Sequence, residues 1–206
     1  MTKIGHTAWQ LLLMLLVVGA ISLGVTVQAA ETPNAPPVRF GTDVVPILTK
    51  LGCNGGGCHG KATGQNGFKL SLFGFEPDMD YEALVKAARG RRLFPADPDR
   101  SLLLLKATSR VPHGGGRRLE ESSDDYRILR DWIAQGATAP RVDDPRLVRI
   151  ELLPQEQILR TNGSQQLRVT AFFSDGTSRE VTRQAVYQSN EPGIAMVDSE
   201  GLVTTS

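Results

Sequence analysis

The pattern of apolar and polar positions changes twice along the chain. An apolar run over about residues 11–25 follows Lys3 near the N-terminus. Between residues 38 and 137 the clearest apolar positions recur at steps of three and four, which is typical of helices. Beyond residue 147 apolar and polar residues alternate, which is typical of strands. The sequence therefore predicts a leader, a helical region and a strand region.

The helical region carries start and stop signals for four helices. Each predicted helix begins at a residue type that caps helix N-termini, and glycines follow the second and the fourth. The last has apolar residues on one face and acidic residues in its first turn. Thr42 caps a predicted helix that runs to Leu51, and Asp80 caps one from Tyr81 to about Arg89. The third predicted helix runs from Ser101 to Thr108, and the fourth opens at Ser122 and ends at Gly136.

The strand region is predicted from its alternation and its turn residues. Residues 138–146, rich in Pro, Asp and Arg, are interpreted as a linker. Asp175-Gly176 supplies a hairpin turn between two of the strands. The predicted strands cover residues 167–173, 179–182, 185–188, 194–197 and 202–204. Residues 147–206 are fewer than the roughly 100 of a typical immunoglobulin sandwich. We therefore expect an incomplete sheet and a longer parent protein, of which this chain is an N-terminal fragment or a truncated product.

Residues 1–30 are predicted to be a signal peptide. The apolar run is short and is followed by Val27-Gln28-Ala29-Ala30, whose small residues suit signal-peptidase cleavage after Ala29 or Ala30. A retained anchor is the alternative, because the run approaches the lower spanning length of about 17 residues. We expect export to the periplasm or cell surface, with no membrane association after cleavage.

Composition excludes several classes of function. The chain has 206 residues, a formal net charge of +1 and two cysteines. Its basic residues are spread along the sequence and accompany no nucleic-acid motif, so no nucleic-acid partner is expected. It also shows no nucleophile with its base, no acidic dyad and no phosphate-binding loop. We therefore expect no enzyme in this chain, which leaves open a catalytic domain beyond residue 206.

Both cysteines lie in one motif, Cys53-Asn54-Gly55-Gly56-Gly57-Cys58-His59. A c-type haem attachment site has two cysteines that form thioethers and a histidine directly after the second. The common form has two residues between the cysteines, whereas this one has four. Three consecutive glycines give the longer loop backbone freedom. The motif predicts one covalent haem c on Cys53 and Cys58, with His59 as an axial iron ligand.

The second axial ligand is predicted to be His113. It lies in Val111-Pro112-His113-Gly114-Gly115-Gly116, and only His59 and His113 remain after signal cleavage. Met79 is the rival, but it sits between Asp78 and Asp80 in what the sequence suggests is a wet, acidic turn. Met196 belongs to the strand region and is a poor candidate. Ligation by two histidines gives a lower reduction potential than histidine with methionine.

Two further groups of residues have both a structural and a functional interpretation. The first is an apolar stretch after the motif, which is either a buried extended segment or a wall against the porphyrin. It contains Phe68, Leu70, Leu72, Phe73 and Phe75. The second is two arginine clusters, which are either solvated surface or partners of the haem propionates. They are Arg89, Arg91 and Arg92, then Arg110, Arg117 and Arg118.

Several of these segments together resemble the planctomycete-type cytochrome c domain. They occur in the expected order over about half of the chain: residues 53–59, 64–70, 98–103, 113–115 and 132–137. The resemblance implies covalent haem binding and electron transfer with a redox partner protein. Many relatives carry Met-Pro-Pro, with the methionine as distal ligand, where this chain has Val111-Pro112-His113. Residues 187–198 and 201–203 resemble bacterial Ig-like domains of group 2.

The fold class expected from these patterns is multidomain. A small all-α cytochrome c-like domain at 31–137 is followed by an incomplete all-β Ig-like sandwich at 147–206. One alternative is a non-haem binding or adhesion protein, with a Cys53–Cys58 disulfide and an Ig-like domain that contacts the cell surface or a polysaccharide. Another is a zinc site formed by Cys53, Cys58, His59 and His113. A disulfide does not require a histidine directly after the second cysteine. Adjacent Cys58 and His59 would not readily reach the same tetrahedral zinc ion, and their spacing matches none of the usual zinc patterns.

Overall fold

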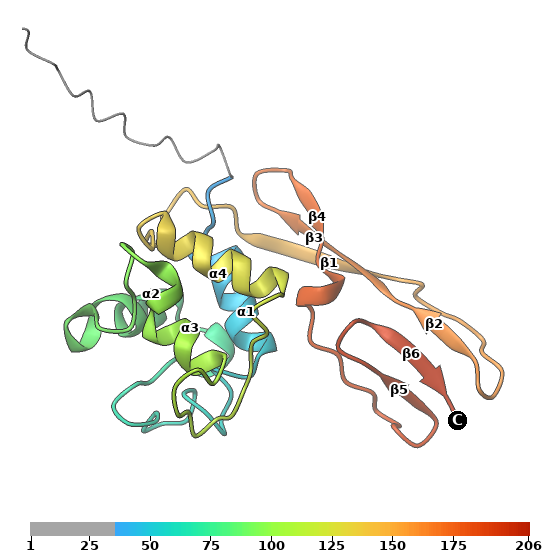
Figure 1. The fold of residues 1–206 in the computed structure, drawn as a ribbon. Helices are drawn as coiled ribbons and strands as arrows, with labels where there is room; N and C mark the ends of the chain where they lie inside the picture. The colour runs from blue at the N-terminus through green and yellow to red at the C-terminus, as the bar shows by residue number, and fades with distance from the viewer. Residues whose placement is uncertain (1–35) are drawn as a thin grey trace, which may run out of the picture. The chain divides into compact units, whose positions relative to one another are not determined.

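The computed structural model describes residues 36–206 (Figure 1). The predicted signal peptide, residues 1–30, lies outside the described residues. No helix within 36–206 is long and apolar enough to cross a membrane. The α-helices are α1 (Val45–Lys50), α2 (Pro77–Tyr81), α3 (Leu102–Ala107) and α4 (Asp124–Ala134). Single turns of π-helix lie at Phe40–Val44 and Glu82–Lys86, and turns of 3-10 helix at Leu72–Gly74, Ala87–Gly90, Pro98–Arg100 and Thr182–Gln184.

Helix α4 supplies the largest part of the helical region's core. Its residues Leu129, Trp132 and Ile133 are fully buried and recur at the predicted steps of three and four. The Trp132 ring packs against Phe40, with centroids 5.4 Å apart, and Tyr81 meets Phe40 edge-on at 5.5 Å. These contacts join the end of the helical region to its beginning. The sequence prediction for this helix is confirmed.

The ends of α4 follow from local chemistry. The Ser123 hydroxyl accepts a hydrogen bond from the Tyr126 N–H at 3.1 Å, so Ser123 is the N-cap, one residue after the predicted Ser122. At the other end Gly136 has φ +90°, a conformation that glycine adopts without steric cost. Asp99 accepts from the Tyr126 hydroxyl at 2.7 Å and ties this helix to the Pro98–Arg100 turn.

The predicted N-cap at Asp80 is wrong. Helix α2 begins at Pro77, and Asp80 lies inside it, fully buried. Its carboxylate accepts from the Ser71 N–H at 2.5 Å and from the Ser71 hydroxyl at 2.7 Å. Burial of a carboxylate requires such partners. Asp80 therefore fixes the position of Ser71 and of the chain next to it.

The strands form two antiparallel sheets of three. They are β1 (Leu147–Leu153), β2 (Ser164–Gln166), β3 (Arg168–Phe173), β4 (Ser178–Glu180), β5 (Ala195–Val197) and β6 (Leu202–Thr205), in the orders β1-β3-β4 and β2-β6-β5. The Asp175-Gly176 hairpin is confirmed, with Gly176 at φ +80° between paired β3 and β4. The strand predicted at 185–188 is wrong, because that segment pairs with no strand within 36–206. Strands β1 and β2 were not predicted.

The expected fold class is also wrong. Residues 36–206 have about 30% helix and 16% strand, with two small antiparallel sheets, rather than an all-α cytochrome domain followed by an Ig sandwich. Every residue of β1 is exposed, and the buried apolar strand residues within 36–206 are Val169 and Ala171. Too few apolar side chains are buried for two sheets to share a sandwich core. In the helical region, positive φ at Ala88 and Arg89 ends regular helix after Lys86.

Candidate functional site

The Cys53–His59 loop begins where α1 ends and is closed by its own backbone. The Cys53 N–H donates to the Leu48 carbonyl at 2.8 Å, which continues the last turn of the helix. The His59 N–H returns to the Cys53 carbonyl at 2.9 Å. The buried Asn54 side chain donates to the Thr49 hydroxyl at 2.8 Å and fastens the loop to α1. The loop therefore holds both thiols and the histidine in one compact turn.

The close approach in this loop occurs at Gly60, which the sequence analysis did not identify. A Cβ atom there would lie 1.9 Å from the Asn54 carbonyl oxygen, so any side chain must displace backbone. The three motif glycines, Gly55 to Gly57, all lack a positive φ. A Cβ at Gly57 would meet nothing within 4 Å. The residue that requires glycine is thus the one after the histidine.

The His59 ring is oriented by a backbone carbonyl. Its Nδ1 lies 3.0 Å from the Phe68 carbonyl oxygen. Because that oxygen can only accept, Nδ1 carries the proton and Nε2 keeps a free lone pair. Burial lowers the pKa of His59, against the opposing effect of the Phe68 hydrogen bond. The ring is therefore neutral at neutral pH, and its Nε2 lone pair is available to a hydrogen-bond donor or a metal.

The Phe68 carbonyl is presented by a tight turn. Gln65 and Phe68 exchange backbone hydrogen bonds at 2.8 and 2.9 Å. Asn66 and Gly67 between them have φ +49° and +73°, as a type I′ turn requires. The Leu70 N–H then donates to the His59 carbonyl at 2.9 Å. Residues 64–70, one of the segments that carry the resemblance, thus hold His59 through both its ring and its backbone.

His113 is held in the same way and lies opposite His59. Its Nδ1 is 2.9 Å from the Gly116 carbonyl oxygen, so its Nε2 also keeps a free lone pair. The two rings have centroids 6.4 Å apart and planes only 9° from parallel. A Cβ at Gly115 would lie 2.9 Å from the His113 ring. The glycine run therefore makes room for this imidazole.

The two imidazoles are the candidate metal ligands of this site. Their ring centres are 6.4 Å apart in a stacked arrangement, with planes 9° from parallel. Each ring has the tautomer that leaves Nε2 available to a metal. The residues that would hold a haem iron are thus His59 and His113, each through its Nε2.

Both cysteines are free thiols. Burial raises the pKa of Cys53 to about 11, with a further contribution from Cys58, so this thiol is protonated at neutral pH. The disulfide alternative finds no support in these thiols. No cluster of three or more His, Cys, Asp or Glu side chains occurs within 36–206, so the zinc alternative has no assembled site there.

The apolar stretch after the motif is mostly at the surface. Leu70 is buried, but Leu72, Phe73 and Phe75 are 48%, 64% and 83% exposed. The prediction of a buried core segment is therefore wrong for these three. Together with Met79 and the backbone of Gly60, Leu72 and Phe75 line an open apolar hollow of about 580 Å³.

The surroundings of Met79 agree only in part with the wet, acidic turn expected from its neighbours. Met79 is 42% exposed and follows the exposed Asp78 in α2, whereas Asp80 points inward to Ser71. Met79 also lines the apolar hollow. His113, by contrast, is the side chain that lies parallel to His59. The structure thus brings His113 and His59 together.

The arginine clusters are divided between surface and interior. Arg92 is buried, whereas the other members of the two clusters are exposed. Within its own loop, Arg118 donates from Nε to the Gly115 carbonyl at 2.8 Å and so braces the loop that carries His113. Nothing in the sequence distinguishes Arg92 from Arg91.

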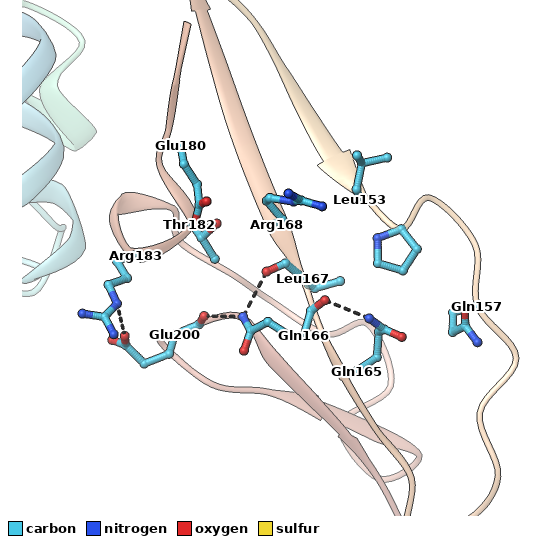
Figure 2. A pocket seen from close by; sticks show the side chains of 11 residues that line it. Leu153, Gln157, Gln165, Gln166, Leu167, Arg168, Glu180, Thr182, Arg183 and Glu200 are labelled. Atoms are coloured by element: carbon cyan, nitrogen blue, oxygen red, sulfur yellow. Dashed lines mark hydrogen bonds and ion pairs between the residues drawn. The ribbon is translucent and has the colours of Figure 1, made fainter.

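A second hollow, of about 760 Å³, lies in the strand region (Figure 2). Its lining is largely polar, and several of its groups already have partners. The Gln166 side chain donates to the carbonyls of Leu167 and Glu200 at 2.9 and 2.8 Å. Arg183 pairs with the Glu200 carboxylate at 2.9 Å. None of the predicted site residues lines this hollow.

A curated protein is similar to part of this chain. No protein-family model matches the chain. Ice-binding protein 1 of Shewanella frigidimarina (strain NCIMB 400) is 35% identical over 78 residues, which is 37% of this chain and 9% of that protein. The chain thus spans a small part of this relative. So partial a match assigns the chain to no family.

Proposed function

We propose that this chain is an exported c-type cytochrome module that binds one haem c covalently and transfers electrons to a redox partner protein. The observation that carries the proposal is the pair of parallel imidazoles, His59 and His113, beside two free thiols. The haem supplies one-electron redox chemistry; the chain supplies attachment, ligation and control of potential. The module is an electron carrier in the periplasm or at the cell surface, without catalysis of its own.

The two thiols, Cys53 and Cys58, would hold the haem through thioether bonds. Cys53 retains its proton at neutral pH because burial raises its pKa to about 11. The loop hydrogen bond from the His59 N–H to the Cys53 carbonyl keeps attachment and ligation within one rigid turn.

The two histidines are the ligands. In each, a backbone carbonyl takes the Nδ1 proton and leaves Nε2 for the metal. Such second hydrogen bonds fix ring orientation and raise ligand basicity. Since methionine ligation raises the potential and histidine does not, the module belongs at the low-potential end of c-type cytochromes.

The proposal is tested by exporting the full chain in a host with c-type haem maturation machinery and recording its absorption spectrum. We expect a coloured protein that is low-spin in both oxidation states and has a low reduction potential. A colourless protein would contradict the proposal. A high-spin spectrum in the native chain would reject the second histidine ligand.

Substitution of Gly115 by alanine is expected to weaken the His113 ligand. The added Cβ would lie 2.9 Å from the His113 ring, so the imidazole must move away. Gly115 lacks a positive φ, so the effect arises from the ring and not from backbone strain. The measurement is the low-spin fraction in the absorption spectrum, with a partial loss expected.

The matched control is Gly114→Ala, one residue away. A Cβ at Gly114 meets nothing within 4 Å, and this glycine also lacks a positive φ. Its spectrum should equal that of the unchanged chain. Equal spectra for both variants would show that the Gly115 contact does not position the ligand.

A further inference from the structure

Arg92 is a buried cation without a carboxylate partner among residues 36–206. It is 5% exposed, and its guanidinium donates to the carbonyls of Ala83 and Ala87 at 3.0 Å each and of Gly67 at 3.4 Å. Buried charges are ordinarily paired with an opposite charge. Arg92 instead contacts three backbone carbonyl oxygens and the face of an aromatic ring. The chain thus maintains an isolated positive charge in its interior.

The Arg92 guanidinium packs against Phe68, the residue whose carbonyl orients the His59 ring. The Arg92 guanidinium carbon is 4.4 Å from the centre of the Phe68 ring. The same ring is 4.5 Å from the His59 imidazole, and the Phe68 carbonyl accepts the His59 Nδ1 hydrogen bond. Gly67, which accepts from Arg92, is the central glycine of the same turn. Arg92 therefore contacts the turn that orients His59 at two points, the Gly67 carbonyl and the Phe68 ring.

We propose that Arg92 is a positioning residue for the axial ligand His59 and that its fixed charge raises the reduction potential of the iron. The inference rests on the proposed function. It assigns to this one arginine a role that its exposed neighbour Arg91 does not share.

The physical basis is electrostatic. Oxidation of the iron adds one positive charge to the site, and a nearby cation disfavours that change. A buried charge acts through a medium of low effective dielectric constant, whereas an exposed one is screened by water and salt. Arg92 also acts in a second way that does not depend on its charge. Through its contact with Phe68 it fixes the orientation of the His59 imidazole plane.

The test compares the reduction potentials of the full-length haem-loaded chain and three variants. Arg92→Met is expected to shift the equilibrium about tenfold toward the oxidised form, a fall of about 59 mV for a one-electron couple. Arg92→Lys, which keeps the charge, should recover most of the shift. Arg91→Met, which removes the same charge from an exposed neighbour, should leave the potential unchanged. Equal potentials in Arg92→Met and Arg91→Met would overturn the inference.

A second variant covers the case in which Arg92→Met does not fold. Phe68→Leu keeps the backbone carbonyl and removes the ring between Arg92 and His59. We expect altered electron paramagnetic resonance g-values, which depend on the angle between the two imidazole planes, with the haem still attached. Unchanged g-values would overturn the positioning role.

Failure of the proposed function looks different. If the unchanged chain carries no covalent haem, the proposed function and this inference both fall. If the unchanged chain is a low-spin cytochrome and the Arg92 variants keep its potential, only this inference falls.

Discussion

Replacing His113 with alanine is expected to convert the low-spin haem spectrum into a high-spin one while the haem stays attached. The proposed attachment groups, Cys53 and Cys58, lie in another loop and should be unaffected. His113 lies parallel to His59, at 6.4 Å between ring centres, and the proposed function assigns it one axial nitrogen, which this variant removes. The measurement is the absorption spectrum of the purified chain, together with a haem stain for attachment.

Met79→Ala is the control, because Met79 is the rival ligand suggested by the sequence. It lines the apolar hollow beside Leu72 and Phe75. We expect this variant to keep the low-spin spectrum. If His113→Ala keeps the low-spin spectrum and Met79→Ala loses it, methionine is the ligand and the bis-histidine account is wrong.

Replacing Gly60 with alanine is expected to destabilise the attachment loop more than any other single methyl addition in it. The new Cβ would lie 1.9 Å from the Asn54 carbonyl oxygen and 3.0 Å from that of Gly55. Overpacking typically costs about 1–3 kcal/mol, and a clash with fixed backbone belongs at or above the upper end of that range. We expect a loss of about 3 kcal/mol in the free energy of unfolding, measured by urea denaturation, and a sharp fall in haem-stained protein.

Gly57→Ala is the comparison within the same loop. Its Cβ meets nothing within 4 Å and its φ is not positive, so the expected change is within about 0.5 kcal/mol. A result in which Gly57→Ala is as damaging as Gly60→Ala would show that loop flexibility, rather than the approach of Gly60 to Asn54, determines stability.

Part of the site follows from sequence alone. The cysteines and His59 adjoin one another in the chain, and His113 was selected because few histidines remain after the predicted signal peptide. The turn at Asn66-Gly67 has a recognisable sequence, since both residues tolerate positive φ. What no pattern indicated is that this turn presents its carbonyl to His59, because the contact depends on how two loops pack.

The errors have similar physical causes. Asp80 has the residue type and position of an N-cap, but burial against Ser71 outweighs that local preference. Phe73 and Phe75 are apolar yet exposed, so hydrophobicity alone did not place them. Strand β1 alternates apolar and polar residues from Val148 to Leu152, so its signal was present in the sequence although the predicted strands began only at residue 167. Arg92 and Arg91 are indistinguishable in sequence, and only packing separates the buried cation from the exposed one.

The central claim is that Cys53 and Cys58 carry a covalent haem, and a haem stain of a denaturing gel tests it most directly. The full chain, including the predicted signal peptide, is expressed in a host with c-type haem maturation machinery, beside the Cys53→Ser, Cys58→Ser double variant. We expect a stained band at the mass of the unchanged chain and none for the double variant. A colourless band for the unchanged chain, or a stain that survives loss of both cysteines, would contradict the account.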